Sequence, residues 1–122
     1  MRTLAGESMA LRATARESEA VTIVDVSGRI TLGDGSALLR KMIRGLLAEG
    51  RMHIVLNLGD VDYIDSSGIG ELVSGFATVK NHGGELKLLN LNRRVRDLLQ
   101  LTKLYTVFDV HTEEVAALRS FR

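Results

Sequence analysis

The feature that most constrains the fold is the alternation of short apolar runs with longer amphipathic segments. Short runs of aliphatic and β-branched residues favour strands, and apolar stripes at helical spacing favour helices. The strand-like runs cover residues 11–17, 21–26, 53–58, 85–89 and 107–110, and the first of them is expected at an edge of the sheet. The helical patterns cover about 37–49, 67–82, 93–102 and the residues after 112. This order is typical of crossover units with parallel strands. We therefore predict one α/β domain with a mostly parallel sheet of four to five strands, about four helices and right-handed crossovers.

Glycine supplies most of the turn signals, because the chain contains 12 glycines and no proline. Residues 31–36 (TLGDGS) are predicted as a loop before the first helix. Residues 59–65 are predicted as a polar loop between a buried strand and the second helix. Thr112 is expected to cap the last helix through its side chain.

The overall composition excludes several classes of function. The 122 residues fit one domain, which we assign to residues 11–122, with residues 1–10 as a flexible N-terminal extension. The net charge of +1 gives no strong attraction to nucleic acid or to a membrane surface, and an aromatic content of 4% leaves little for base stacking. The chain has no cysteine, so disulfides and thiolate metal sites are excluded. No run approaches the ~20 apolar residues of a membrane span, and residues 1–10 do not form a signal peptide, so we expect a cytoplasmic protein.

The most informative stretch is Asp65-Ser66-Ser67-Gly68-Ile69-Gly70, between a predicted strand and a predicted helix. Its aspartate and serines have the side chains that cap helix N-termini, so one interpretation is a cap and nothing more. No register gives a capping box, however, since Ile69 and Gly70 stand three residues after the two serines. The two glycines also weaken the first turn by up to about 1 kcal/mol each relative to alanine. The second interpretation is that the backbone near Ser67 must stay open to another molecule.

The stretch HIVLNLGDVDYIDSSGIGELV resembles the central segment of the STAS domain, as found in bacterial anti-sigma factor antagonists. In outline the resemblance extends from about residue 11 to residue 120, and includes VTIVDVSGRI and the turn Gly83-Gly84-Glu85-Leu86. The run DSSGIG is its most specific part, whereas the rest is mainly α/β patterning.

This resemblance implies a phosphorylation switch at Ser67, the second serine of the run, with Ser66 and Thr31 as alternative sites. It implies a partner that is both anti-sigma factor and serine kinase, and a serine phosphatase that removes the phosphate. The unmodified protein would bind the anti-sigma factor and thereby free the sigma factor. The protein itself would need no cofactor, because ATP belongs to the kinase. The partner-binding surface implied here consists of Thr31, Asp34, Asp65, Ser66, Ser67, Gly68 and Ile69.

One position departs from the family pattern. Many family members carry aspartate in the loop after the segment matching Ser27-Gly28-Arg29-Ile30, and here that position is Thr31. Relatives in large stress-signalling assemblies often have threonine near this place, which keeps a scaffold subunit of such an assembly as an alternative function. A STAS module that binds a small ligand or serves a transporter is a further alternative. A simple antagonist is expected to be a monomer or a weak dimer.

Other motifs give no support for an enzyme. The dinucleotide-binding fingerprint fails because Val73 occupies its third glycine position, and neither a P-loop nor a nucleophile elbow is present. The three histidines, His53, His82 and His111, are scattered, so neither a catalytic triad nor a metal site is expected. A basic cluster on one predicted helix has two interpretations, a solvated face or a contact surface for an acidic partner. It consists of Arg93, Arg94, Arg96 and Lys103.

Overall fold

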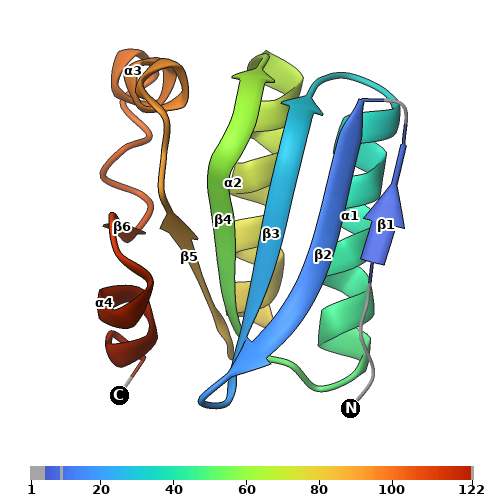
Figure 1. Ribbon diagram of the computed structural model, residues 1–122, viewed down its shortest axis with the longest axis vertical. Coiled ribbons are helices and arrows are strands. Elements are labelled where there is room, and N and C mark those ends of the chain that lie inside the picture. The colour runs from blue at the N-terminus through green and yellow to red at the C-terminus, as the bar shows by residue number, and fades with distance from the viewer. Residues whose placement is uncertain (1–4, 9, 122) are drawn as a thin grey trace.

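The computed structural model describes residues 5–8 and 10–121, which form a six-stranded sheet and four helices (Figure 1). The strands lie in chain order across the sheet: β1 (Ala5–Glu7), β2 (Leu11–Ser18), β3 (Val21–Ile30), β4 (His53–Ile64), β5 (Glu85–Leu89) and β6 (Val110–His111). The helices are α1 (Asp34–Ala48), α2 (Ser66–Asn81), α3 (Arg93–Leu101) and α4 (Glu114–Arg119). Strands β1 to β3 pair antiparallel, and β3 to β6 pair parallel. The α/β class and the largely parallel sheet are thus confirmed, with six strands in place of the four to five expected.

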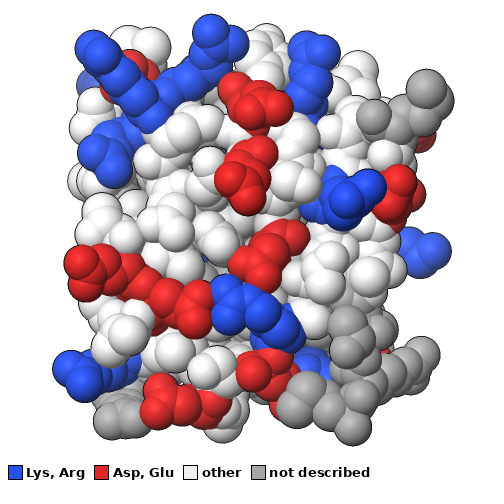
Figure 2. All heavy atoms as spheres, viewed as in Figure 1, with Lys and Arg blue, Asp and Glu red and all other residues white. Residues whose placement is uncertain are grey.

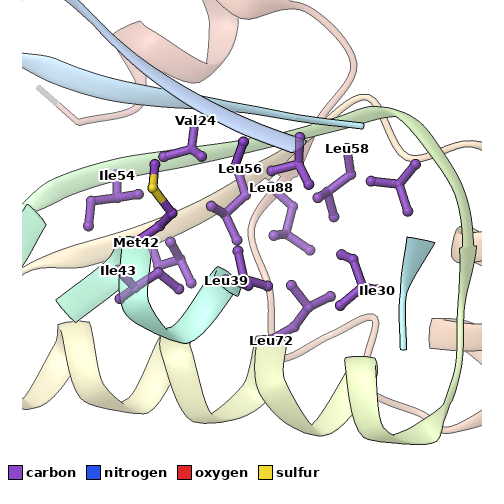
Figure 3. Packing of buried hydrophobic residues seen from close by; sticks show 14 of the residues in the cluster. Val24, Ile30, Leu39, Met42, Ile43, Ile54, Leu56, Leu58, Leu72 and Leu88 are labelled. Atoms are coloured by element: carbon purple, nitrogen blue, oxygen red, sulfur yellow. The ribbon is translucent and has the colours of Figure 1, made fainter. Parts of the chain in front are cut away.

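The main core lies between the sheet and helices α1 and α2, which cover one face of it (Figure 1). Figure 3 shows leucine and isoleucine side chains of both helices meeting those of the central strands. Leu39, Leu56 and Leu72, one each from α1, β4 and α2, have no exposed surface. Truncation of such a side chain to alanine typically costs about 2–5 kcal/mol, so this layer fixes the two helices on the sheet.

Strand β4 continues to Ile64, so the prediction of a polar loop at 59–65 was wrong. The strand keeps its parallel pairing with β3 as far as Ile30 and Ile64, through two register shifts. Val61 is buried between the exposed Asp60 and Asp62, which is the alternation of a half-buried strand. A register shift follows Val61, and Ile64 is again buried in the core. The polar residues that suggested a loop therefore form the solvent side of a strand.

Several other boundaries also differ from the prediction. Helix α1 begins at Asp34, inside the predicted loop 31–36, and the predicted strand at 107–110 is reduced to Val110–His111. The prediction that Thr112 caps α4 was wrong, because the N-cap position is held by Glu113. The side chain of Glu113 makes no capping hydrogen bond. Strand β2 is paired on both sides and is not an edge.

The N-terminal segment contributes a strand to the sheet. Ala5–Glu7 lies within the segment 1–10 that we expected to extend from the domain, and it pairs antiparallel with β2. For these three residues the expectation of a flexible extension is corrected. Residues 1–4 and 9 lie outside the described residues, so for them it stays a prediction.

The second face of the sheet holds α4 through a small apolar cluster and an ion-pair network. Ala117 and Leu118 of α4 pack on Ile23 and Val55 of the central strands. Arg16 of β2 then bridges two carboxylates, with its Nε 2.6 Å from Asp25 Oδ2 and its Nη2 2.5 Å from Glu114 Oε1. Burial acts to raise the pKa of Asp25, but the hydrogen bonds from Arg16 and Asn57 outweigh it and lower the pKa. The hydrogen bond from Arg16 likewise lowers the pKa of Glu114.

We expect Glu114→Gln to reduce the free energy of unfolding at pH 7 by about 0.5–1 kcal/mol, the range for partly exposed ion pairs. Because the folded-state pKa of Glu114 lies below its ordinary value of 4.5, the pair stabilises the fold above that value. The difference between wild type and variant should then disappear as pH falls through the folded-state pKa. Urea titrations at neutral and acidic pH measure it, with Glu113→Gln as the matched control, and an effect independent of pH would contradict the assignment.

Candidate functional site

The candidate site forms where β3 and β4 end side by side. These strands are parallel and Ile30 pairs with Ile64, so the loops that follow them emerge at the same edge of the sheet. One loop runs from Thr31 to Gly33 into α1, and the other is reduced to Asp65, directly before α2. Figure 1 shows both at the upper end of the molecule, near the first turns of α1 and α2. Ligand sites of open α/β sheets commonly lie at this edge.

The carboxylate of Asp65 joins the two loops. Its Oδ1 accepts a hydrogen bond from the backbone N–H of Gly68 at 2.8 Å, which caps α2. Its Oδ2 accepts a second bond from the backbone N–H of Leu32 at 3.1 Å, and its own N–H donates to the carbonyl oxygen of Ile30 at 3.2 Å. Asp65 therefore fixes the start of α2 and the end of β3 relative to each other.

The hydroxyl groups of Ser66 and Ser67 are not needed for capping. The two serines are the first two residues of α2, where Ser66 is exposed and Ser67 is half-buried. Among the residues that the structure describes, no hydrogen bond involves either hydroxyl. Of the three oxygen-bearing side chains in the run, only Asp65 caps the helix, so the cap interpretation does not account for the serines.

The two glycines of the run have different structural roles. A Cβ atom on Gly68 would lie 2.2 Å from the carbonyl oxygen of Ile30 and 2.5 Å from Ile64 Cγ1. Gly68 therefore permits the close approach of α2 to the strand ends, which is an internal packing requirement. A Cβ atom on Gly70 would meet nothing within 4 Å among the described residues outside its own turn, and Gly70 is exposed. Packing thus explains Gly68 and leaves the exposed Gly70 without a structural reason.

The loop after β3 places an apolar side chain beside this helix start. Leu32 is 80% exposed, although its backbone is held by Asp65. Thr31 is half-buried, and its carbonyl oxygen accepts bonds from the N–H and the hydroxyl of Ser36 at 3.1 and 2.9 Å. Asp34 is exposed at the first position of α1, where the helix dipole favours an acid.

The structure thus brings together most of the sequence-derived site residues, but it buries two of them. Gly68 and Ile69 are covered by the protein, with Ile69 only 4% exposed, so they position the site from within. The accessible members are Thr31, Asp34, Asp65, Ser66 and Ser67. The sequence analysis did not name Leu32 among the candidate site residues. The feature that could have indicated it is an isolated leucine in the polar loop TLGDGS.

The three histidines belong to other parts of the fold than the loops of this site. His53 starts β4 and stacks on Phe121 with ring centroids 5.0 Å apart. His82 follows the last turn of α2, with its Nδ1 2.8 Å from the carbonyl oxygen of Thr78. His111 lies on β6, with its Nε2 3.1 Å from Asp109 Oδ2. Within residues 5–8 and 10–121, no group of three or more His, Asp or Glu side chains could hold a metal ion.

The fold and the site define a small α/β domain whose second helix starts with two serines, close to the exposed Leu32, whose hydroxyls bond to none of the described residues. The chain belongs to the STAS domain family, whose model matches residues 12–117. In the part of the chain that the structure describes, no helix has the length and apolar character that crossing a bilayer requires.

Similar proteins include two curated bacterial regulators. The chain is 33% identical to the anti-sigma-B factor antagonist of Bacillus subtilis (strain 168) over 102 residues, which cover 84% of this chain and 92% of the relative. It is 29% identical to the anti-sigma F factor antagonist of Paenibacillus polymyxa over 98 residues, covering 80% and 84% of the two chains. Among solved structures, the Bacillus cell fate determinant SpoIIAA in its phosphorylated form has a similar fold, with a TM-score of 0.69, 19% identity and coverage of 90% and 99%.

Substitution of the two glycines by alanine should have opposite effects. Gly68→Ala forces a methyl group against the carbonyl of Ile30 and is expected to destabilise the fold by about 1–3 kcal/mol. Gly70→Ala adds a methyl group in open space and should stabilise α2 by up to about 1 kcal/mol. Thermal unfolding of the two variants measures both effects, and equal destabilisation by both would contradict the packing argument.

Asp65 should contribute to stability where the two serines do not. Asp65→Ala removes both hydrogen bonds and is expected to cost about 1–2 kcal/mol. Asp65→Asn leaves a single acceptor oxygen and should cost less, because one of the two bonds can be kept. Ser66→Ala and Ser67→Ala should stay within about 0.5 kcal/mol of wild type. Chemical denaturation of the four variants tests this, and a large loss in either serine variant would assign capping to that hydroxyl.

Proposed function

We propose that this protein is an anti-sigma factor antagonist that binds an anti-sigma factor, itself a serine kinase, and is switched off by phosphorylation of Ser67. A serine phosphatase would restore the binding form. The observation that carries this proposal is the hydroxyl of Ser67, which makes no hydrogen bond with any residue that the structure describes, at a helix start that is already capped by Asp65. The two antagonist relatives support the class of partner, since their names describe opposition to anti-sigma factors.

Phosphate on Ser67 would change the surface without disturbing the fold. A phosphate group adds about −1.5 to −2 charges at neutral pH, and a helix N-terminus accommodates an anion well. The charge would appear beside Leu32 and close to the carboxylate of Asp65. A partner that covers Leu32 would have to desolvate this anion, and a penalty of even ~3 kcal/mol weakens binding more than a hundredfold.

Ser67 is preferred over Ser66 and Thr31 as the modified residue. The resemblance implies that Ser67 matches the family's phosphorylated serine, and neither serine hydroxyl makes a hydrogen bond within the described part of the chain. Thr31 lies in a segment held by the bonds from Ser36 to its carbonyl oxygen. Fragmentation of intact protein from its native host would locate the phosphate, and phosphate on Thr31 in place of Ser67 would favour a scaffold subunit.

We infer that the domain acts by binding and not by catalysis, in the cytoplasm, and as a monomer or weak dimer. The described residues contain neither a histidine close in the fold to Ser66 and Ser67 nor a metal cluster, and ATP would be bound by the kinase. Light scattering tests the oligomeric state, since a stable large oligomer would favour the scaffold function. A thermal-shift screen with nucleotides and lipids tests the ligand-binding alternative.

The central test is the affinity for the anti-sigma factor kinase of the same organism. Ser67→Asp should weaken binding by about 10- to 100-fold, because it places a charge where the partner docks. Its melting temperature should stay within a few degrees of wild type, since an acid at the helix start is favourable. Ser67→Ala should bind the kinase like wild type and accept no phosphate at this position. Isothermal calorimetry and a kinase assay supply the measurements, and unchanged affinity of Ser67→Asp would overturn the proposal.

A further inference from the structure

A stripe of residues on α2 that faces α1 begins at Ser67. Glu71 and Gly75 follow Ser67 at intervals of four residues, so the three lie on one side of the helix, one turn after another. Glu71 and Gly75 are buried and Ser67 is half-buried. A Cβ atom on Gly75 would lie 2.7 Å from Ile43 Cδ1, so this side of α2 packs on α1. Ser67 therefore lies at the exposed N-terminal end of the contact between the two helices.

An arginine of α1 binds the middle residue of this stripe with two hydrogen bonds. Arg40 Nε lies 3.1 Å from Glu71 Oε1, and Arg40 Nη2 lies 2.9 Å from Glu71 Oε2. The side chain of Glu71 is only 8% exposed, whereas that of Arg40 is 50% exposed. A two-bonded pair of this kind fixes direction as well as distance. The buried carboxylate thus holds the guanidinium in one orientation at the surface groove between α1 and α2, which both residues line.

The guanidinium of Arg40 keeps one edge free for another acceptor. A guanidinium has five N–H donors, and Glu71 takes one from Nε and one from Nη2. Among the described residues, none accepts a hydrogen bond from Nη1. The edge formed by Nη1 and Nη2 can therefore bind an anion through two further hydrogen bonds, which is the geometry in which arginine binds phosphate.

This guanidinium lies within reach of a phosphate on Ser67. Arg40 contacts Glu71, and one turn later in both helices Ile43 meets Gly75, so α1 and α2 run side by side in the same direction. Ser67 precedes Glu71 by one turn, which is about 5.4 Å along the axis. Side chains of a helix lean toward its N-terminus, so the long side chain of Arg40 leans toward the end of the groove at which Ser67 lies.

The stability of the two helices does not explain the pair of Arg40 and Glu71. Removal of a carboxylate from water costs free energy that offsets much of its attraction to the arginine. Apolar residues of similar volume commonly stabilise such a contact as well or better. The pair is better explained if the guanidinium that Glu71 orients has a further ligand.

Other cations at this end of the molecule lie beside a different side of α2. Arg93 and Arg94 of α3 line a groove together with Ser66. Figure 2, which views the sheet from the side away from α1 and α2, shows basic side chains along the upper edge, over α3 and the end of β3. Ser67 is one residue further, about 100° round the helix, on the side of Glu71. Ser66 therefore lies toward α3 and Ser67 toward α1.

We propose that Arg40, oriented by Glu71, pairs with the phosphate on Ser67 in the phosphorylated protein. The inference rests on the proposed function, because it says how this chain holds the modified residue. Glu71 and Asp65 are carboxylates near the phosphate and oppose its charge. The bonds from Arg40 offset this repulsion, so that Ser67 can carry a phosphate while α1 and α2 stay packed.

The test uses the full chain with phosphoserine genetically encoded at position 67, so that no kinase is needed. The ³¹P resonance follows the second ionisation of the phosphate, whose ordinary midpoint is about pH 6. Arg40→Gln should raise this midpoint by about 0.5–1 pH unit, because the doubly charged form loses its cation. Arg40→Lys should restore only part of the difference, since an ammonium group lacks the two-bonded geometry.

Matched variants remove the same charge elsewhere. Arg44→Gln acts one turn further along the groove between α1 and α2, and Arg94→Gln acts on α3. Both should leave the ³¹P midpoint nearly unchanged. An unchanged midpoint in Arg40→Gln, or an equal rise in Arg94→Gln, would overturn the proposal.

Melting temperatures give a second readout that a purely structural pair would not change. Phosphorylation should leave the melting temperature of wild type equal or higher. In Arg40→Gln it should lower the melting temperature by a few degrees, because the phosphate then faces Glu71 and Asp65 without the cation. Each variant is compared with its own unmodified form, so any stability that Arg40→Gln itself loses cancels. An equal change on phosphorylation in both proteins would contradict the pairing.

Binding to the kinase distinguishes failure of this pair from failure of the proposed function. If the kinase binds the unmodified chain and not the phosphorylated one, while Arg40→Gln leaves the ³¹P midpoint unchanged, the pair is overturned and the proposed function stands. If the kinase binds neither form, the proposed function falls. The ³¹P titration then decides on its own whether Arg40 holds a phosphate on Ser67.

Discussion

The structure of the site depends on one carboxylate that accepts hydrogen bonds from two different loops. Asp65 caps α2 through Gly68 and holds the loop after β3 through Leu32. Without this bridge the two loops would be neighbours only because their strands are parallel. With it, the exposed leucine, the two serines and the first turn of α2 keep fixed relative positions, which is what a surface needs for selective binding.

This arrangement separates the groups that stabilise the fold from the groups that the proposed function assigns to partner binding. Asp65 and Gly68 serve the fold, one by hydrogen bonding and the other by close packing on Ile30. Ser67 and Gly70 serve neither purpose, and both lie on the outer side of the same helical turn. A charge can therefore be added to Ser67 at little expense to stability.

The parts of the fold that follow from local pattern could be predicted, and the parts that need distant partners could not. Strand β5 was predicted with its observed bounds, and α2 within one residue at each end, because Gly83 and Gly84 mark the end of the helix and the start of the strand. The last residues of β4 looked like a loop, since only pairing with β3 shows that Asp60 and Asp62 form the outer side of a strand. The serine run was visible in the sequence. The hydrogen bond between Leu32 and Asp65 was not, because these two residues are brought together only by the tertiary fold.

The close fit of Gly68 against the carbonyl of Ile30 has a consequence for how the proposed kinase would recognise Ser67. The local shape around Ser67 exists only when the end of β3 lies behind the helix start and Leu32 is tied to Asp65. A linear peptide with the same residues has neither contact. Under the proposed function, a kinase would therefore recognise the folded surface around Ser67 and not a linear motif. Chains that are newly made or damaged would be phosphorylated only after they have formed that surface.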